Sequence, residues 1–397
     1  MRTPLSTRSI RSGRATRPLR TRKGLALLTA TAALVAAGAT AYAAGPGTAG
    51  PDPHRAPLAG MRILISNDDS MRAAKASNSD GLGLYELRRA MCAAGADVVV
   101  LAPWQVQSGK GTAVTNGGTV TVQRRAAAAL PDGYQGDCAG APARGAVFGV
   151  CLATGPCAPD APSATPADTV KLALRGGLRA KVGWAKAPDL VLTGINSGPN
   201  VSASVNDSGT VGAAVAAIDQ GVPALAFSSS GDASNTSFPR ANYRANAEFG
   251  ARLVAGLRER GLLTAAFALK VDYPDVSAGQ RAKAPVWTRV GDGAVVYHAF
   301  EPRTGGTGTG GTGGTGGTDE EADSTTFDIA LGLCPFDGGG EGECAEGRRD
   351  ADSTWLLDKG HVTVAPITWD RTYGTPVDAR RALRGIERYI TQEAPRP

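Results

Sequence analysis

The sequence predicts an α/β fold built on a mostly parallel sheet, and two observations carry this prediction. The first is a strand–helix–strand pattern of about forty residues, with an apolar run at 61–66, helical spacing of apolar residues over 83–94 and a second apolar run at 97–102. The second is a pair of later strands, 189–193 and 222–228, that flank an Ala-rich helix. Strands that alternate with helices need crossover connections, which give parallel strands covered on both faces.

The composition fits a globular chain with a sizeable core. The chain has 397 residues, of which 42% are hydrophobic. Its formal charge of +6 comes from the beginning of the chain, because residues 1–43 hold eight basic and no acidic residues. The remainder has 34 basic and 36 acidic residues, so its charge does not support binding of a nucleic acid polymer.

Residues 1–43 are predicted to be a signal peptide. A basic segment ends at Lys23, an apolar run follows from 24 to 39, and Ala41-Tyr42-Ala43 supplies the small residues of a cleavage site. An uncleaved anchor is the alternative, but the run is shorter than the roughly 20 residues that span a bilayer. We therefore expect a secreted or extracytoplasmic protein that does not associate with membrane after cleavage. Residues 44–60 are predicted to be a disordered spacer and 61–397 the folded domain, with 304–318 as a flexible Gly/Thr-rich insertion.

The remaining elements follow from periodicity and from residues that begin or end helices. Gly95 is predicted to end the first helix, and Ser208 to cap the Ala-rich helix that ends at Ile218. Alternation over 118–123 suggests an antiparallel strand, whereas 136–166 resembles a loop. Further helices are predicted at 168–178, 242–260 and 378–392, and further strands at 327–333, 355–357 and 361–367.

Six cysteines in an exported chain are expected to be oxidised at least in part. We expect one bridge between Cys334 and Cys344 and another within the group Cys138, Cys151 and Cys157, while Cys92 is expected to be a buried free thiol. A zinc site is not supported, because no Cys-x-x-Cys pair is present and no histidine lies near the cysteines.

Polar residues follow three of the predicted strands. Asn67, Asp68 and Asp69 follow the first strand, Ser108 lies in the loop after the second, and Asn196 follows the strand at 189–193. The carboxyl ends of parallel strands form the edge at which ligands bind in open α/β sheets. Two adjacent carboxylates repel each other unless a cation compensates, and an oxygen set of this kind suits Mg²⁺ or Mn²⁺. An isolated Asp-Asp pair can also be a helix cap or a solvated turn.

The segment 194–200 and the helix start at Ser208, Gly209 and Thr210 suggest an anion site at the same edge. Free N–H groups and the helix dipole favour a phosphate there, although an ordinary cap with packing glycines gives the same pattern. A metal site beside an anion site suggests metal-assisted hydrolysis of a phosphoester.

In these segments the chain resembles the SurE family of 5′/3′-nucleotidases (survival protein E, acid-phosphatase-like). The resemblance is clear from Met61 to about Phe227 and weaker to about Thr372. Its motifs are Arg62-Ile-Leu-Ile-Ser-Asn-Asp-Asp69, Gln107-Ser-Gly109, Thr165-Pro-Ala-Asp168, Pro188-Asp-Leu-Val-Leu-Thr-Gly-Ile-Asn-Ser-Gly-Pro-Asn200, Ser208-Gly-Thr-Val-Gly-Ala-Ala214, Val271-Asp-Tyr-Pro274 and Asp358-Lys-Gly-His-Val-Thr-Val-Ala-Pro-Ile367.

The resemblance implies a metal-dependent phosphomonoesterase that acts on nucleoside monophosphates or other small phosphomonoesters. It implies a Rossmann-like three-layer core with a small β-rich C-terminal extension, assembled as a homodimer or homotetramer. The residues that match the family pattern are Asp68 and Asp69 for catalysis, Asp68, Asp69, Ser108 and Asn196 for the metal ion, and Asn67, Asn200, Ser208, Gly209 and Thr210 for the substrate and its phosphate.

The chain departs from the family pattern around this site. Ser70 replaces a glycine after the aspartate pair, residues 70–82 form a longer segment, and Lys110 and Gly111 replace small residues. The cysteine-containing segment 133–163 resembles an insertion.

The motifs of two other enzyme classes are absent from the sequence. A Ser–His–Asp hydrolase requires a Gly-x-Ser-x-Gly motif and a P-loop enzyme requires Gly-x₄-Gly-Lys-Ser/Thr, and the sequence contains neither. An exported nucleotide- or metal-binding module without turnover remains an alternative, as does a broad acid phosphatase or exopolyphosphatase.

Overall fold

The computed structural model describes residues 56–73, 80–232, 237–302, 327–334, 344–368 and 377–397. These residues belong to one compact unit, Pro53–Pro397. The predicted signal peptide, most of the predicted spacer and the Gly/Thr-rich insertion lie outside the described residues. No helix in the described ranges is long and apolar enough to span a membrane.

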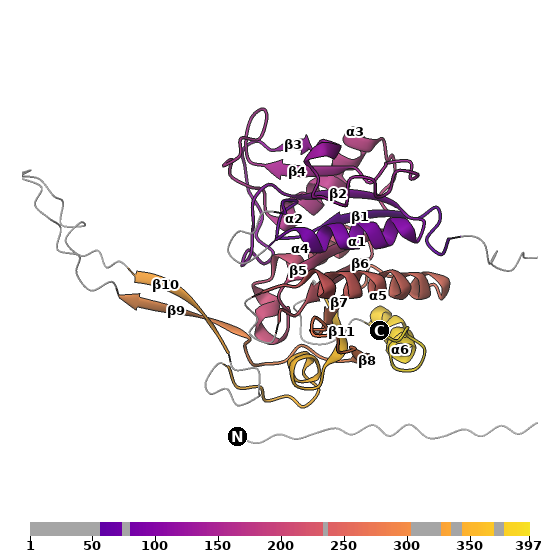
Figure 1. Ribbon diagram of the computed structural model, residues 1–397, viewed down its shortest axis with the longest axis vertical. Helices are drawn as coiled ribbons and strands as arrows, with labels where there is room; N and C mark the ends of the chain where they lie inside the picture. The colour runs from indigo at the N-terminus through magenta and orange to yellow at the C-terminus, as the bar shows by residue number, and fades with distance from the viewer. Residues whose placement is uncertain (1–55, 74–79, 233–236, 303–326, 335–343, 369–376) are drawn as a thin grey trace, which may run out of the picture. The chain divides into compact units, whose positions relative to one another are not determined.

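The described strands form a nine-stranded sheet and a separate two-stranded sheet (Figure 1). The order of the large sheet is β3 (Thr121–Arg124), β4 (Val147–Cys151), β2 (Asp97–Pro103), β1 (Arg62–Ser66), β5 (Leu190–Ser197), β6 (Ala224–Ser229), β7 (Ala268–Tyr273), β11 (His361–Ile367) and β8 (Lys283–Trp287). The six neighbouring strands β4, β2, β1, β5, β6 and β7 are parallel. At the two ends of this group, β3 pairs antiparallel with β4 and β11 pairs antiparallel with β7. The predicted mostly parallel α/β fold is confirmed.

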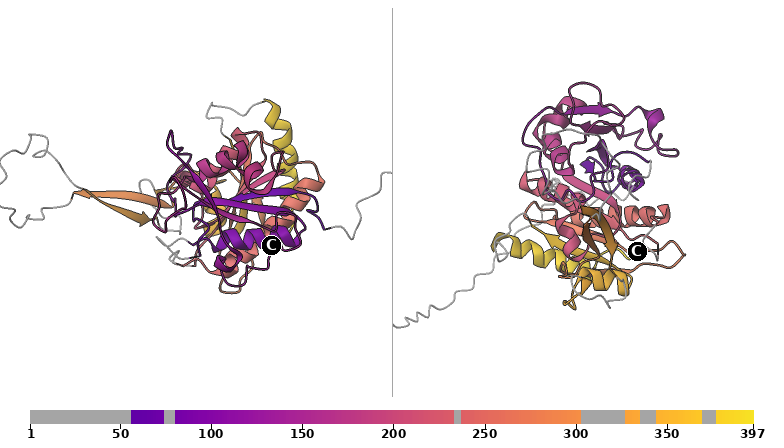
Figure 2. Two further views of the ribbon diagram at one scale, coloured as in Figure 1. Left: turned by 90° about the horizontal axis from the view of Figure 1, so that it is seen from above. Right: turned by 90° about the vertical axis from the view of Figure 1, so that its left-hand side faces the viewer.

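Helices cover both faces of this sheet, as the view from above shows (Figure 2). Leu64 packs in the hydrophobic cluster that includes α2 (Pro166–Leu172) and α4 (Gly209–Asp219). Its neighbours Ile63 and Ile65 pack in the cluster that includes α1 (Leu82–Ala93), α5 (Arg240–Glu259) and α6 (Val377–Gln392). Because both faces are covered, the central strands are continuous apolar runs.

Three features of the chain differ from the predicted elements. The segment predicted to be a loop at 136–166 contains β4, a short strand that is completely buried between β2 and β3. The strand predicted at 355–357 is instead part of a helical turn, Thr354–Asp358. The strand predicted at 189–193 continues as β5 to Ser197, so Asn196 lies within the strand and not after it.

The two-stranded sheet pairs β9 (Val296–Pro302) with β10 (Phe327–Leu333). The prediction located β10 but not β9 or β8. Apolar side chains of this hairpin are exposed, among them Phe300 at 61% and Ile329 at 70%. Buried apolar area therefore contributes little to the stability of this hairpin in the single chain.

All six cysteines are paired. The bridges Cys334–Cys344 and Cys151–Cys157 agree with the prediction. The prediction that Cys92 is a free thiol is wrong, because Cys92 near the end of α1 bonds to Cys138. Periodicity identified Cys92 as a helix residue, but it gave no information on which distant loop packs against that end of the helix.

Candidate active site

The topology brings the predicted site residues to one edge of the sheet. Strand β1 lies between β2 and β5: the chain adds β2 and β4 on one side of β1 and then returns to add β5, β6 and β7 on the other side. The carboxyl end of β1 is therefore a point at which strand order reverses, which is where parallel α/β sheets form a ligand crevice. Asn67, Asp68 and Asp69 follow β1 directly, and Asn196 lies near the carboxyl end of the adjacent β5.

Asp68 is buried against the beginning of α4. The residue is 2% exposed, and the Thr210 hydroxyl donates a hydrogen bond of 2.5 Å to its Oδ1. Burial raises the pKa of Asp68, while hydrogen bonds from the Thr210 side chain and from the backbone of Thr210 and Gly209 act in the opposite direction. The helix start therefore stabilises the ionised form of this carboxyl.

Asp69 is completely buried, and fewer hydrogen bonds offset the burial of its charge than in Asp68. Its Oδ2 accepts a hydrogen bond of 2.8 Å from the backbone N–H of Ser197, whereas its Oδ1 has no hydrogen-bond partner among the described residues. Burial and the negative charges of Asp68 and Asp80 raise the pKa of Asp69 well above its usual range. Two buried carboxylates next to each other thus lack a positive partner in the described part of the chain.

Asn196 lies at the same place as the aspartates. Its Oδ1 is 3.5 Å from the Thr210 hydroxyl oxygen, which also donates to Asp68. Its Nδ2 donates to the backbone carbonyl of Gly198 at 2.9 Å, which leaves the amide oxygen directed toward Thr210 and Asp68. The amide oxygen of Asn196 and the carboxylate of Asp68 therefore lie on either side of one hydroxyl.

Backbone hydrogen bonds hold the loop after β2, which carries Ser108, to Asp68 and to the segment just before α4. The backbone N–H of Gln107 donates to the Asp68 carbonyl at 2.7 Å, and that of Gly111 donates to the Asp207 carbonyl at 2.9 Å. A Cβ at Gly212 of α4 would lie 1.9 Å from the Gly111 carbonyl oxygen, so only glycine permits this approach. Ser108 is exposed and adjoins Gln107 in this loop.

In the structure, the first residues of α4 make hydrogen bonds to Asp68. The Ser208 hydroxyl accepts from the Val211 N–H at 3.0 Å and so caps the helix as predicted. A Cβ at Gly209 would lie 2.8 Å from the Asp68 Cβ, so glycine allows the helix to approach the carboxylate. The hydrogen bonds of Gly209 and Thr210 go to Asp68, and their predicted contact with a phosphate remains a prediction.

Two asparagines are predicted to bind phosphate: Asn67 directly precedes Asp68, and Asn200 follows Asn196 in the chain. Asn67 is completely buried, and neither its Oδ1 nor its Nδ2 has a hydrogen-bond partner among the described residues. Asn200 is 6% exposed, and its Nδ2 donates to the Ser228 hydroxyl at 2.7 Å. A buried amide without a partner is costly, so Asn67 is suited to a ligand that supplies the missing hydrogen bonds.

These residues fit a hard divalent cation. The described residues contain no group of three or more His, Cys, Asp and Glu that could hold a metal ion. The candidate set is instead two carboxylates, an amide oxygen and a hydroxyl, which are oxygen ligands of the kind that Mg²⁺ and Mn²⁺ prefer. A cation would compensate the charges of Asp68 and Asp69 and would supply a partner for the Asp69 Oδ1.

Sequence reasoning missed the residues that support Asp69. The Tyr243 hydroxyl lies 2.7 Å from the Ser197 hydroxyl, and the backbone N–H of Asp80 donates to the same hydroxyl at 3.3 Å. Tyr243 belongs to α5, and its position in a helical apolar pattern predicts only burial. Nothing in the local pattern distinguishes it from a core residue.

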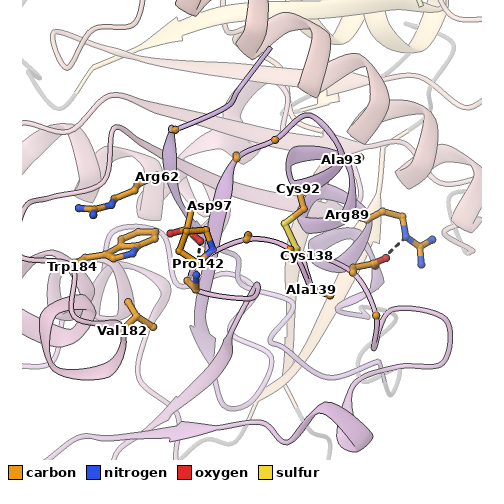
Figure 3. Close-up of a pocket in the computed structure, with 18 of the residues that line it drawn as sticks. Arg62, Arg89, Cys92, Ala93, Asp97, Cys138, Ala139, Pro142, Val182 and Trp184 are labelled. Carbon is orange, nitrogen blue, oxygen red and sulfur yellow. Dashed lines mark hydrogen bonds and ion pairs between the residues drawn. A yellow bond between two sulfur atoms is a disulfide. The ribbon is translucent and has the colours of Figure 1, made fainter. Parts of the chain in front are cut away.

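A cavity of about 800 Å³ lies at the opposite edge of the sheet, next to the start of β1 and β2 (Figure 3). Arg62 lies over the Trp184 ring at 5.6 Å, and the Cys92–Cys138 disulfide forms part of the wall. Asp97 accepts a hydrogen bond of 2.8 Å from the Ala143 N–H. The cavity contains none of the predicted site residues.

Comparison with known proteins identifies relatives of this chain. The family model described as survival protein SurE matches residues 63–296, which include every predicted site residue. The 5′-nucleotidase SurE of Geotalea daltonii is 33% identical over 231 residues, which are 58% of this chain and 72% of the relative. That of Desulforamulus reducens is 34% identical over 236 residues, again 58% and 72%.

A further relative and one solved structure are also similar. The 5′-nucleotidase SurE of Solidesulfovibrio magneticus is 35% identical over 168 residues, which are 42% of this chain and 50% of the relative. The crystal structure of the SurE protein from Aquifex aeolicus has a TM-score of 0.49 and 22% sequence identity, and the match covers 82% of this chain and 99% of that chain.

Proposed function

Because this chain belongs to the SurE family, we propose that it is a metal-dependent phosphomonoesterase that hydrolyses nucleoside monophosphates to nucleoside and phosphate. This is a hydrolase reaction on a phosphoric monoester bond, the type implied by the name 5′-nucleotidase that its relatives bear. The substrates are small molecules, and the near-balanced charge of residues 44–397 gives no support to a nucleic acid polymer as substrate.

The observation that carries this proposal is the aspartate pair. Asp68 and Asp69 are buried side by side, both have a raised pKa, and one oxygen of Asp69 has no hydrogen-bond partner among the described residues. Such an arrangement is unfavourable in the absence of a ligand, because burial penalises each charge and the charges repel each other. It becomes favourable when a divalent cation occupies the space between the strand ends.

We assign the metal ion, Mg²⁺ or Mn²⁺, to Asp68, Asp69, Ser108 and Asn196. A bound cation of this kind polarises the phosphoryl group and offsets the charge that develops during hydrolysis. The chain's own contribution is to hold the ligands: hydrogen bonds from Thr210 and the start of α4 favour the ionised form of Asp68, and the Ser197 N–H orients Asp69. Both aspartates are proposed as catalytic residues on this basis.

We assign the phosphate to Asn67 and Asn200, with Ser208, Gly209 and Thr210 at the boundary of the same pocket. Asn67 has unused hydrogen-bonding atoms, and Asn200 is held by Ser228 at the carboxyl end of β6. The start of α4 directs its dipole at this region, so it favours a negative charge there even though Asp68 takes its nearest hydrogen bonds.

We also propose that the chain is exported after cleavage of residues 1–43. The pairing of all six cysteines supports an oxidising compartment. A homodimer or homotetramer is proposed as the working assembly, and the exposed apolar side chains of β9 and β10 support it, because a surface of that kind is usually covered by a partner.

The test is hydrolysis of a panel of nucleoside 5′- and 3′-monophosphates, p-nitrophenyl phosphate and polyphosphate by the chain without residues 1–43. We expect release of phosphate that EDTA abolishes and that Mn²⁺ or Mg²⁺ restores. Binding of nucleotide without turnover would instead identify a binding module, and activity that survives complete removal of metal would contradict the proposal. Equal rates on all monoesters would indicate a broad phosphatase.

A further inference from the structure

Three charged side chains are buried together in the β7 region, where an apolar core is expected. Lys270 and Asp272 lie on β7, and Asp352 lies just before the helical turn at 354–358. All three side chains are 0% exposed. The Lys270 ammonium forms ion pairs with Asp272 and, at 2.7 Å, with Asp352. One cation therefore joins two carboxylates from distant parts of the chain.

The second oxygen of each carboxylate holds backbone of the loop that follows β5. The Oδ1 of Asp272 accepts a hydrogen bond of 2.8 Å from the Asn200 N–H. The Oδ1 of Asp352 accepts bonds from the N–H groups of Ser202 at 3.0 Å, Gly291 at 3.1 Å and Ser353 at 2.9 Å. The loop is thus fixed at two points two residues apart, with Asn200 at one of them.

The conformation of this loop depends on such support. Ser202 has φ of 51°, a left-handed conformation that costs a non-glycine residue energy and persists only where the surroundings hold it. Its hydroxyl donates to Glu346 at 2.7 Å, so a third carboxylate holds the same residue. Hydrogen bonds from the segment 346–353 and from β7 thereby determine where the backbone carrying Asn200 lies.

Stability alone does not account for buried charges here. Desolvation of an ion pair usually costs as much as the pair returns, and apolar residues of similar size are often as stabilising or more so. Burial raises the pKa of Asp272 to about 6, although the Lys270 ammonium lowers it, so the ionised form of Asp272 depends on its neighbours. What the charges provide is geometry, because each carboxylate oxygen is directed at one defined donor.

We propose that Lys270, Asp272 and Asp352 are positioning residues for phosphate binding: the buried cluster fixes the backbone at Asn200 and so places its side chain against the phosphate of the substrate. This rests on the proposed function, in which Asn200 contacts that phosphate. None of the three residues touches the substrate. Their effect reaches it through the Asn200 N–H and through the adjoining bond between the Asn200 Nδ2 and Ser228.

The experiment uses Asp272→Asn, which keeps the size of the side chain. An amide has one acceptor and one donor group, whereas Asp272 accepts from both Asn200 and Lys270. In either orientation the amide NH₂ group faces another donor, so the variant displaces Asn200 or Lys270. We expect KM for a nucleoside monophosphate and Ki for inorganic phosphate each to rise about tenfold. We expect kcat to change less than about threefold and the Mn²⁺ concentration for half-maximal activity to stay the same.

A double-mutant cycle with Asn200→Ala separates positioning from a general loss of structure. If Asp272 acts through Asn200, then Asp272→Asn adds little to KM or Ki in the Asn200→Ala background. Asp97→Asn is the matched control, since Asp97 is a buried carboxylate that accepts a backbone N–H at the opposite edge of the sheet. We expect this control to leave KM and Ki unchanged.

Three outcomes would overturn the inference while leaving the proposed function intact: an active Asp272→Asn variant with unchanged KM and Ki, additive effects with Asn200→Ala, or an equal effect of Asp97→Asn.

Should Asp272→Asn not fold, Asp352→Asn perturbs the same ammonium while Asn200 keeps its acceptor, and a smaller rise in KM is expected. If neither variant folds, the cluster serves the whole fold and not one loop, which also overturns it. Failure of the proposed function is distinct, because the unmodified chain would then show no metal-dependent hydrolysis.

Discussion

The two edges of the large sheet differ in how their polar groups are satisfied. At the carboxyl edge, Asp68 and Asp69 are buried with raised pKa values, and the side chain of Asn67 has no hydrogen-bond partner among the described residues. At the amino edge, Asp97 accepts a backbone hydrogen bond and Arg89 pairs with Asp137 at 3.0 Å. The cavity of about 800 Å³ nevertheless lies at the amino edge.

If the reactive edge is the carboxyl edge, as proposed, then unmet hydrogen bonds and charges identify it better than the size of a hollow does. A cavity lined by satisfied groups offers a ligand little beyond contact area. Buried carboxylates that pair with no positive side chain of the described residues, and a buried amide with no hydrogen-bond partner among them, can gain free energy when a metal ion or phosphate binds. Substitutions at the carboxyl edge should therefore change activity, whereas those at the amino edge should change only stability.

The largest effect is expected from Asp69→Asn. The amide keeps the shape of the side chain but removes one of the two charges that would hold the cation, so we expect kcat to fall by about a thousandfold or more. Steady-state kinetics with saturating Mn²⁺ measures this loss, and circular dichroism checks the fold. Asp97→Asn at the amino edge should retain normal kcat. Near-normal, metal-dependent activity of Asp69→Asn would mean that the site is misassigned.

The next effect concerns stability at the amino edge. Replacement of both Cys92 and Cys138 by alanine removes a bridge that spans 46 residues, and we expect the free energy of unfolding to fall by about 4 kcal/mol. Urea denaturation measures it. The bridge Cys151–Cys157 spans only 6 residues, so its removal should cost about 2 kcal/mol. If the Cys92/Cys138 variant, still folded, lost most of its kcat/KM, the two edges would not be independent.

A smaller effect is expected from Thr210→Val. Valine has the same shape as threonine but cannot donate to Asp68, whose ionised form then loses its side-chain hydrogen bond. We expect the Mn²⁺ concentration for half-maximal activity to rise about tenfold, with full activity recovered at high metal concentration. Thr169→Val is the control, because the Thr169 hydroxyl is also buried but donates only to the carbonyls of Thr165 and Pro166. Similar metal requirements in both variants would contradict a role for Thr210 in metal binding.

The sequence was most informative where a local pattern repeats. The apolar runs gave β1, β2, β6 and β11 with small errors at their ends, and helical spacing correctly identified the buried face of α1. It failed where a strand is short and its neighbours are rich in Gly, Ala and Pro, as for β4. It also gave no separate signal for the extension of β5 through Asn196, because two glycines near that end resemble a turn.

For the site, the sequence determined which residues are at the carboxyl edge, since parallel strands carry the residues after their ends to the same place. Only the tertiary structure decided which partners satisfy the hydrogen bonds and charges of those residues. The bond between Thr210 and Asp68 joins residues 142 positions apart, and the pairing of Cys92 with Cys138 and of Lys270 with Asp352 also depends on segments that meet only after folding. Hydrogen bonds and ion pairs depend on distances of a few tenths of an ångström, and a pattern of residue types along the chain does not contain those distances.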